Sequence, residues 1–129
     1  MGAGNKKARY RMTAVDVFQK LFDAYVGCYR SRNAAGCASF FAKDAELYSP
    51  FGPAAKGRTA IETIHAEWLE EGGEDKVIEV VQAGIDGQIG WCLATFREGT
   101  TDDGTSLNVL YRQPDGGWLI RQCSLNETP

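Results

Sequence analysis

The single histidine of this chain is the residue whose type points most directly to chemistry. His65 is the sole imidazole among 129 residues, and imidazole is the only side chain whose unperturbed pKa suits proton transfer at neutral pH. It shares an apolar helix face with Ile61, Ile64 and Trp68. A buried neutral imidazole needs hydrogen-bond partners, and the Tyr25 hydroxyl is the obvious candidate. A histidine satisfied within the core is the alternative.

Other reactive groups do not gather in the sequence. The four cysteines have no C-x-x-C pair, which argues against a structural metal site and favours free buried thiols. No nucleophile–base pair, phosphate-binding glycine loop or dinucleotide fingerprint is visible. We therefore expect neither a metal nor a cofactor.

Length and charge narrow the class of protein. A chain of 129 residues with 43% hydrophobic and 24% charged residues is expected to form one domain with its own core. The net charge of −3 argues against binding nucleic acid, which needs a basic face. No apolar stretch suits a signal peptide or a bilayer span, so we expect a cytoplasmic protein without a membrane partner. Residues 1–12 are expected to be a flexible tail, and 13–129 the domain.

Three helices are predicted in the first half of the chain. The first runs from about residue 13 to 30, where aromatic side chains recur at helical spacing. A short helix follows Asn33, which is a good N-cap residue. A third is expected to begin at Thr59, with Glu62 completing a capping box, and to end before Gly72.

The second half changes to strands. After a short strand over 45–49, turn residues separate four further strands, over 77–85, 89–97, 105–112 and 118–125. One of the turns is expected at Asp103–Gly104. Helices followed by a meander indicate an α+β fold. Because so short a meander cannot close by itself, we predict a cone-shaped, curved antiparallel sheet wrapped around the three helices, an α+β half-barrel.

A combination of short motifs extends this prediction. The motifs are Tyr25-Val26, Asn33-Ala34-Ala35, Phe40-Phe41-Ala42-Lys43-Asp44-Ala45, Ser49-Pro50-Phe51-Gly52, Gly57-Arg58 with Ile61, and Asp115-Gly116-Gly117-Trp118-Leu119-Ile120. Over residues 13 to 126 the chain resembles the nuclear-transport-factor-2-like superfamily, and within it the SnoaL-like polyketide cyclases and steroid Δ-isomerases. The resemblance implies a pocket between helices and sheet, and a homodimer formed through the outer sheet face. This superfold hosts enzymes, binding modules and assembly domains.

The resemblance also implies roles for three residues predicted to be catalytic: Tyr25, His65 and Asn108. Tyr25 matches the isomerase tyrosine that donates a hydrogen bond to the enolate oxygen of the substrate, and His65 stands where some isomerases have a second, supporting tyrosine. The sequence departs from the isomerase pattern at two positions where the isomerases have an acidic residue. Ser49 stands in the position of the general base, and a serine without a base cannot abstract a proton. Asn108 stands in the position of a second acid, and its amide can donate to an oxyanion but cannot exchange a proton.

A set of substrate-binding residues is predicted around these three. The set is Ser49, Phe51, Trp68, Trp91, Gln122 and Ser124. A shift of one residue in the last strand would replace Gln122 and Ser124 by Arg121 and Cys123. Two functions stay open. The first is an isomerase-, cyclase- or hydrolase-like enzyme for a small apolar substrate, and the second is a non-catalytic protein that binds such a ligand or serves as a dimeric interaction module.

Overall fold

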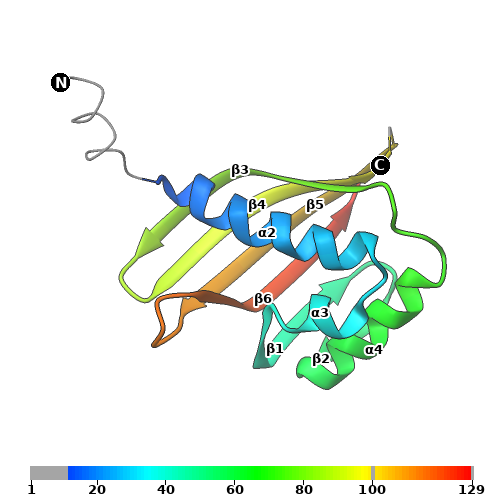
Figure 1. The fold of residues 1–129 in the computed structure, drawn as a ribbon, viewed down its shortest axis with the longest axis horizontal. Coiled ribbons are helices and arrows are strands. Elements are labelled where there is room, and N and C mark those ends of the chain that lie inside the picture. The colour runs from blue at the N-terminus through cyan, green and yellow to red at the C-terminus, as the bar shows by residue number, and fades with distance from the viewer. Residues whose placement is uncertain (1–11, 100, 129) are drawn as a thin grey trace.

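The computed structural model describes residues 12–99 and 101–128, so the predicted tail lies almost wholly outside the described residues (Figure 1). None of the described helices is long and apolar enough to span a membrane. The cytoplasmic location stays a prediction. The elements are helices α2 (Ala14–Arg30), α3 (Ala34–Ala38) and α4 (Arg58–Leu69), and strands β1 (Phe41–Ser49), β2 (Gly52–Lys56), β3 (Lys76–Asp86), β4 (Ile89–Glu98), β5 (Thr101–Arg112) and β6 (Trp118–Glu127).

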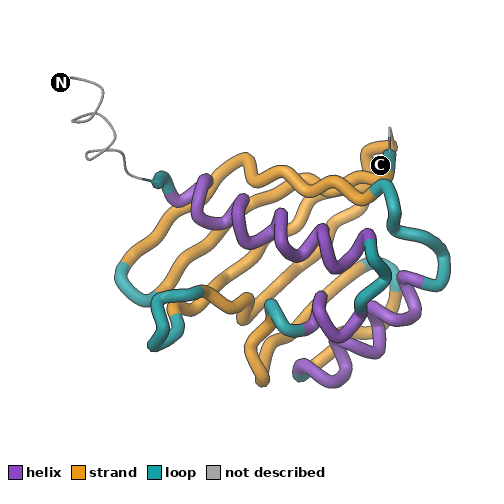
Figure 2. Tube along the Cα trace, in the orientation of Figure 1, coloured by secondary structure: helices purple, strands orange, loops and turns teal. Residues whose placement is uncertain are grey.

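The strands form one sheet with helices against one of its faces. The strand order is β2-β1-β6-β5-β4-β3, and every neighbouring pair is antiparallel except β1 and β6, which are parallel. Helix α2 crosses the sheet, while α3 and α4 lie toward the end formed by β1 and β2 (Figures 1 and 2). The predicted α+β arrangement of helices and a curved sheet is confirmed, with one parallel pair that the meander did not predict.

The start of α4 differs from the prediction. The helix begins at Arg58 with Gly57 as its N-cap, at a φ of 91°, and no side chain caps its backbone, so the capping box predicted at Thr59 is wrong. Strand β1 holds the start instead. The N–H of Gly57 donates to the carbonyl of Ala45 (2.8 Å), and Nε of Arg58 donates to the carbonyl of Phe41 (2.9 Å). These bonds fix where α4 lies relative to the sheet.

The sheet also differs from the prediction in two places. Strand β2 was not predicted from the sequence, and it pairs with β1. The turn predicted at Asp103–Gly104 is wrong, because both residues lie within β5 and the chain instead turns at Gly99, where φ is 60°. At Gly104 the missing side chain serves close approach, since a Cβ there would lie 1.8 Å from the carbonyl oxygen of Asn126 on β6.

One aromatic contact joins α2 to the sheet. The rings of Phe18 on α2 and Trp118 on β6 meet edge to face, with centroids 5.2 Å apart. Phe18 is fully buried, and its ring lies over Gly90 of β4, where a Cβ would come within 2.4 Å of Cζ of Phe18. The glycine therefore lets the helix lie close to the strand.

Two glycine substitutions test this contact. Gly90→Ala is expected to destabilise the fold by about 1–3 kcal/mol, because the new methyl group displaces the Phe18 ring. Gly27→Ala is the control, since Gly27 is exposed on α2 with nothing within 4 Å of a new Cβ, and alanine there should stabilise the protein by roughly 0.5–1 kcal/mol. Urea unfolding measures both. Equal effects at the two positions would contradict the assignment.

Candidate functional site

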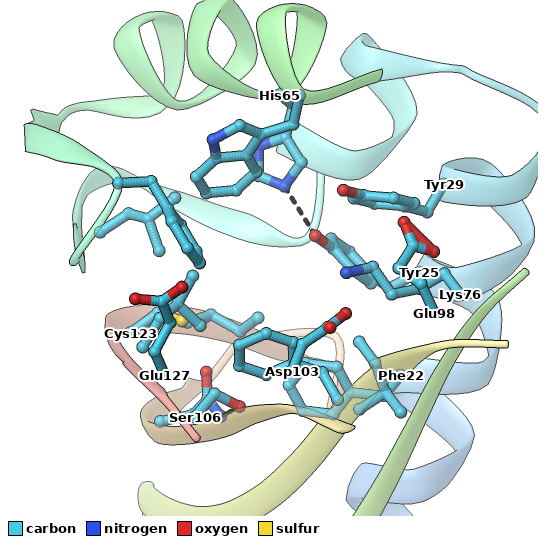
Figure 3. Close-up of a pocket in the computed structure, with 18 of the residues that line it drawn as sticks. Phe22, Tyr25, Tyr29, His65, Lys76, Glu98, Asp103, Ser106, Cys123 and Glu127 are labelled. Carbon is cyan, nitrogen blue, oxygen red and sulfur yellow. Dashed lines mark hydrogen bonds between the residues drawn. The ribbon is translucent and has the colours of Figure 1, made fainter. Parts of the chain in front are cut away.

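A cavity of about 480 Å³ lies between the helices and the sheet. Side chains of α2, α4 and five strands line it, and Figure 3 shows many of them. Much of its wall is aromatic, and the aromatic residues are Phe22, Tyr25, Tyr29, Phe41, Phe51, Trp68 and Phe96. A wall of this kind suits a ligand with a large apolar surface.

The wall of this cavity contains the predicted pair of Tyr25 and His65. The Tyr25 hydroxyl lies 2.7 Å from Nε2 of His65, and both residues are buried (Figure 3). Nδ1 of His65 lies 2.8 Å from the carbonyl oxygen of Ile61. Because a carbonyl oxygen can only accept, Nδ1 carries the hydrogen of the neutral ring. The unprotonated Nε2 then accepts the hydrogen bond that Tyr25 donates.

Burial keeps both members of the pair neutral. Burial lowers the pKa of His65 to about 4, although the bond to Ile61 opposes the shift. Burial also raises the pKa of Tyr25 well above its ordinary value. Moving the phenol proton to the imidazole is therefore strongly unfavourable, because each shift opposes the charged form that it would create. The pair is a neutral hydrogen-bonded unit at physiological pH.

Asn108, the third residue predicted to be catalytic, also lines the cavity. It is fully buried on β5, and its Nδ2 donates to Oγ of Ser106 (3.1 Å), which lines the cavity too. Its Oδ1 is buried and has no hydrogen-bond partner among the described residues. A buried acceptor without a partner costs free energy.

A group of charged side chains completes the wall. Lys76 on β3 pairs across the sheet with Glu98 on β4, and its Nζ lies 4.5 Å from the ring centroid of Tyr29. Burial lowers the pKa of Lys76, and the neighbouring carboxylates of Glu98 and Asp103 oppose that shift. Four carboxylates, those of Glu71, Glu98, Asp103 and Glu127, thus share the wall with one ammonium group.

The structure places two of the six predicted substrate-binding residues at the cavity. Phe51 and Trp68 line it, and their rings meet edge to face at 6.3 Å. Ser49 does not line it; its Oγ accepts the backbone N–H of Phe51 in the turn after β1. Trp91 lies on the outer face and is 42% exposed, because inward residues alternate with outward ones along β4 and Cys92 takes the buried position.

Gln122 and Ser124 also lie outside the cavity. Of the alternatives that the sequence left open for the last strand, Cys123 lines the cavity and Arg121 does not. Strand β6 has a bulge at Arg121: Val109 pairs with Gln122, but its neighbour Leu110 pairs with Ile120. The extra residue reverses the alternation. Ile120 therefore faces the cavity before the bulge, and Cys123 faces it after.

Several lining residues were missed by the sequence prediction, above all Lys76, Glu98, Asp103 and Ser106. Two of them could have been predicted from the alternation of side chains along a strand. Ser106 lies two residues before Asn108, and Glu98 lies two residues after Phe96, so in each case both members face the same side of a strand. In the described part of the chain, no group of three or more His, Cys, Asp or Glu side chains could hold a metal ion.

Comparison with known proteins finds matches through structure alone. No family profile matches the sequence, and no curated protein matches it. A ketosteroid isomerase-like protein from Erwinia carotovora atroseptica has a TM-score of 0.71 at 16% identity, over 92% of this chain and 100% of that one. An NTF2-like protein of unknown function from Pseudomonas putida has a TM-score of 0.72 at 18% identity, over 90% of this chain and 87% of that one.

A third similar structure bears on assembly. A protein from Xanthomonas campestris described as a calcium/calmodulin-dependent protein kinase II association domain has a TM-score of 0.70 at 19% identity, over 87% of this chain and 86% of that one. Identities this low show the fold alone. The chain has the nuclear-transport-factor-2-like fold, and the resemblance stated from its motifs is confirmed at that level.

The buried histidine makes stability depend on pH. The pKa of His65 is about 4 in the folded protein and 6.5 ordinarily, so the unfolded chain binds a proton first as the pH falls. The contribution of His65 to the free energy of unfolding is therefore fully present above pH 6.5. It decreases as the pH falls toward 4, by about 3 kcal/mol in total. Urea unfolding at several pH values measures this, with His65→Leu as the variant that lacks the contribution. An imidazole NMR signal that titrates near pH 6.5 in the folded protein would contradict the assignment.

Proposed function

We propose that this protein binds a small, largely apolar molecule in the cavity, and that Tyr25, His65 and Asn108 form its polar contacts. The observation that carries the proposal is the hydrogen-bonded Tyr25–His65 pair in the wall of a cavity that seven aromatic side chains help to line. A cavity of about 480 Å³ falls in the usual range of ligand pockets, which combine apolar side chains with convergent polar groups.

The same geometry favours binding over acid–base catalysis of the isomerase kind. Ser49 stands where the base was expected, and it lies outside the cavity. The phenol proton of Tyr25 is donated to His65 and is not offered to a bound carbonyl. His65 is neutral and a weak base at pH 7, since burial lowers its pKa to about 4. Neither member of the pair is therefore suited to shuttle protons.

Filling the hollow tests the proposal. N-phenyl-1-naphthylamine is a neutral apolar dye that brightens in apolar sites, and it is expected to bind one site per chain. Ser106→Leu projects a larger side chain into the cavity and should weaken binding at least about fivefold, because overpacking of this kind costs about 1–3 kcal/mol. The matched control is Ser124→Leu, the same substitution on the exposed face of β6, which should bind the dye as the wild type does. Equal binding by the two variants would contradict the proposed site.

We further propose that the protein is a homodimer formed through the outer face of the sheet. Six apolar residues form three cross-strand pairs on that face: Ile89 with Tyr111, Trp91 with Val109, and Leu93 with Leu107. We call these six the outer patch. Four of them, Ile89, Trp91, Leu107 and Tyr111, are 42–53% exposed. Contiguous apolar surface on one face is typical of protein interfaces, and the likeness to an association domain is consistent with assembly.

A charge in the outer patch should separate the subunits. Trp91→Asp is expected to shift the protein from dimer to monomer in light scattering, because a carboxylate buried in an apolar interface lacks a partner. Met12→Asp serves as the control, since Met12 is similarly exposed (45%) but lies before α2. A wild-type protein that is monomeric at working concentration would overturn the dimer without affecting the cavity.

A further inference from the structure

We infer that the cavity selects a ligand whose polar group donates a hydrogen bond to Tyr25, such as an apolar alcohol or amine, over one that can only accept, such as a ketone. This inference rests on the proposed binding function and adds the chemical class of the ligand. It reverses the role that the resemblance implied for Tyr25, which was to donate to an oxygen of the substrate.

The direction follows from a chain of three groups. Nδ1–H of His65 donates to the carbonyl of Ile61, one turn earlier in α4, at 2.8 Å. Nε2 of the neutral ring is then an acceptor, and it lies 2.7 Å from the Tyr25 oxygen. A tyrosine has one hydroxyl hydrogen. Since Tyr25 donates it to His65, only its oxygen lone pairs remain for a ligand.

The oxygen of Tyr25 discriminates between donors and acceptors. A hydroxyl or amino group of a ligand could donate to it. A ketone oxygen could not, and beside the Tyr25 oxygen it would leave two acceptors facing each other.

The charges of the wall add to this preference. Four carboxylates line the cavity against the single ammonium of Lys76, so the potential favours a donor or a cation over an anion. Lys76 is a donor itself, but its Nζ lies over the rings of Tyr29 (4.5 Å) and Phe96 (5.1 Å). Glu98 and Asp103 act on the same ammonium.

Two matched ligands test the inference. 1-Tetralol and 1-tetralone have nearly the same size, but the alcohol can donate or accept whereas the ketone only accepts. Their dissociation constants are measured by displacement of N-phenyl-1-naphthylamine. The readout is the ketone-to-alcohol ratio of these constants, compared between proteins so that differences in hydration of the two ligands cancel.

His65→Leu is the decisive variant, because it releases the Tyr25 proton to the cavity. The ratio is expected to fall about fivefold from wild type to His65→Leu, the effect of roughly one hydrogen bond. The matched control is Ser124→Leu on the exposed face of β6, which should give the same ratio as the wild type. A ratio that His65→Leu leaves unchanged, or one that falls as far in Ser124→Leu, overturns the inference.

A measurement on the wild type keeps the inference testable if His65→Leu does not fold. Long-range ¹H–¹⁵N NMR spectra of the single imidazole show which ring nitrogen carries the hydrogen. We expect a protonated Nδ1 and an unprotonated Nε2, and a hydrogen on Nε2 would overturn the inference. If the dye, 1-tetralol and 1-tetralone all fail to bind, the proposed function fails as well. The NMR result reports only on the direction of the Tyr25–His65 hydrogen bond.

Discussion

The hydrogen bond between Tyr25 and His65 is the interaction on which the rest of the site depends. It joins helices α2 and α4 across 40 residues of sequence at a distance of 2.7 Å. A broken bond would leave a buried hydroxyl and a buried imidazole nitrogen without partners, which is costly in an apolar wall. The bond therefore holds two helices at one end of the cavity while leaving the space beside it open. It also sets which hydrogen-bonding atoms the cavity presents.

The sheet determines the rest of the cavity wall, and its irregularities matter as much as its regular pairing. The bulge at Arg121 lets Ile120 and Cys123 face the cavity from one strand, although they are an odd number of positions apart, with two residues between them. A second bulge lies in β3 between Val80 and Gln82. Bulges bend and twist strands, so the irregularities that determine which side chains face the cavity also help to curve the sheet.

The Tyr25–His65 pair could be predicted from the sequence. Helical spacing put each residue on an apolar helix face, and the family resemblance put the two helices side by side. The direction of the bond could not be predicted, because it depends on how the imidazole ring turns toward the carbonyl of Ile61. The phase of β6 was out of reach for a related reason. A bulge is defined by pairing with β5, so alternation along the sequence alone left open whether Gln122 or Cys123 faces the cavity.

The two departures from the isomerase pattern have a common physical meaning once the pair is seen as neutral. A phenol that stabilises an enolate needs a base to create that charge, and the position of the base is a serine outside the cavity. An amide replaces the second acid, and its free oxygen is an acceptor. Without a base nearby, a Tyr25 proton directed into the cavity would serve no proton transfer, and directing it to His65 satisfies a buried nitrogen instead. The substitutions at Ser49 and Asn108 and the direction of the Tyr25 bond are thus consistent with one another, and together they describe a pocket built to hold a hydrogen-bond donor.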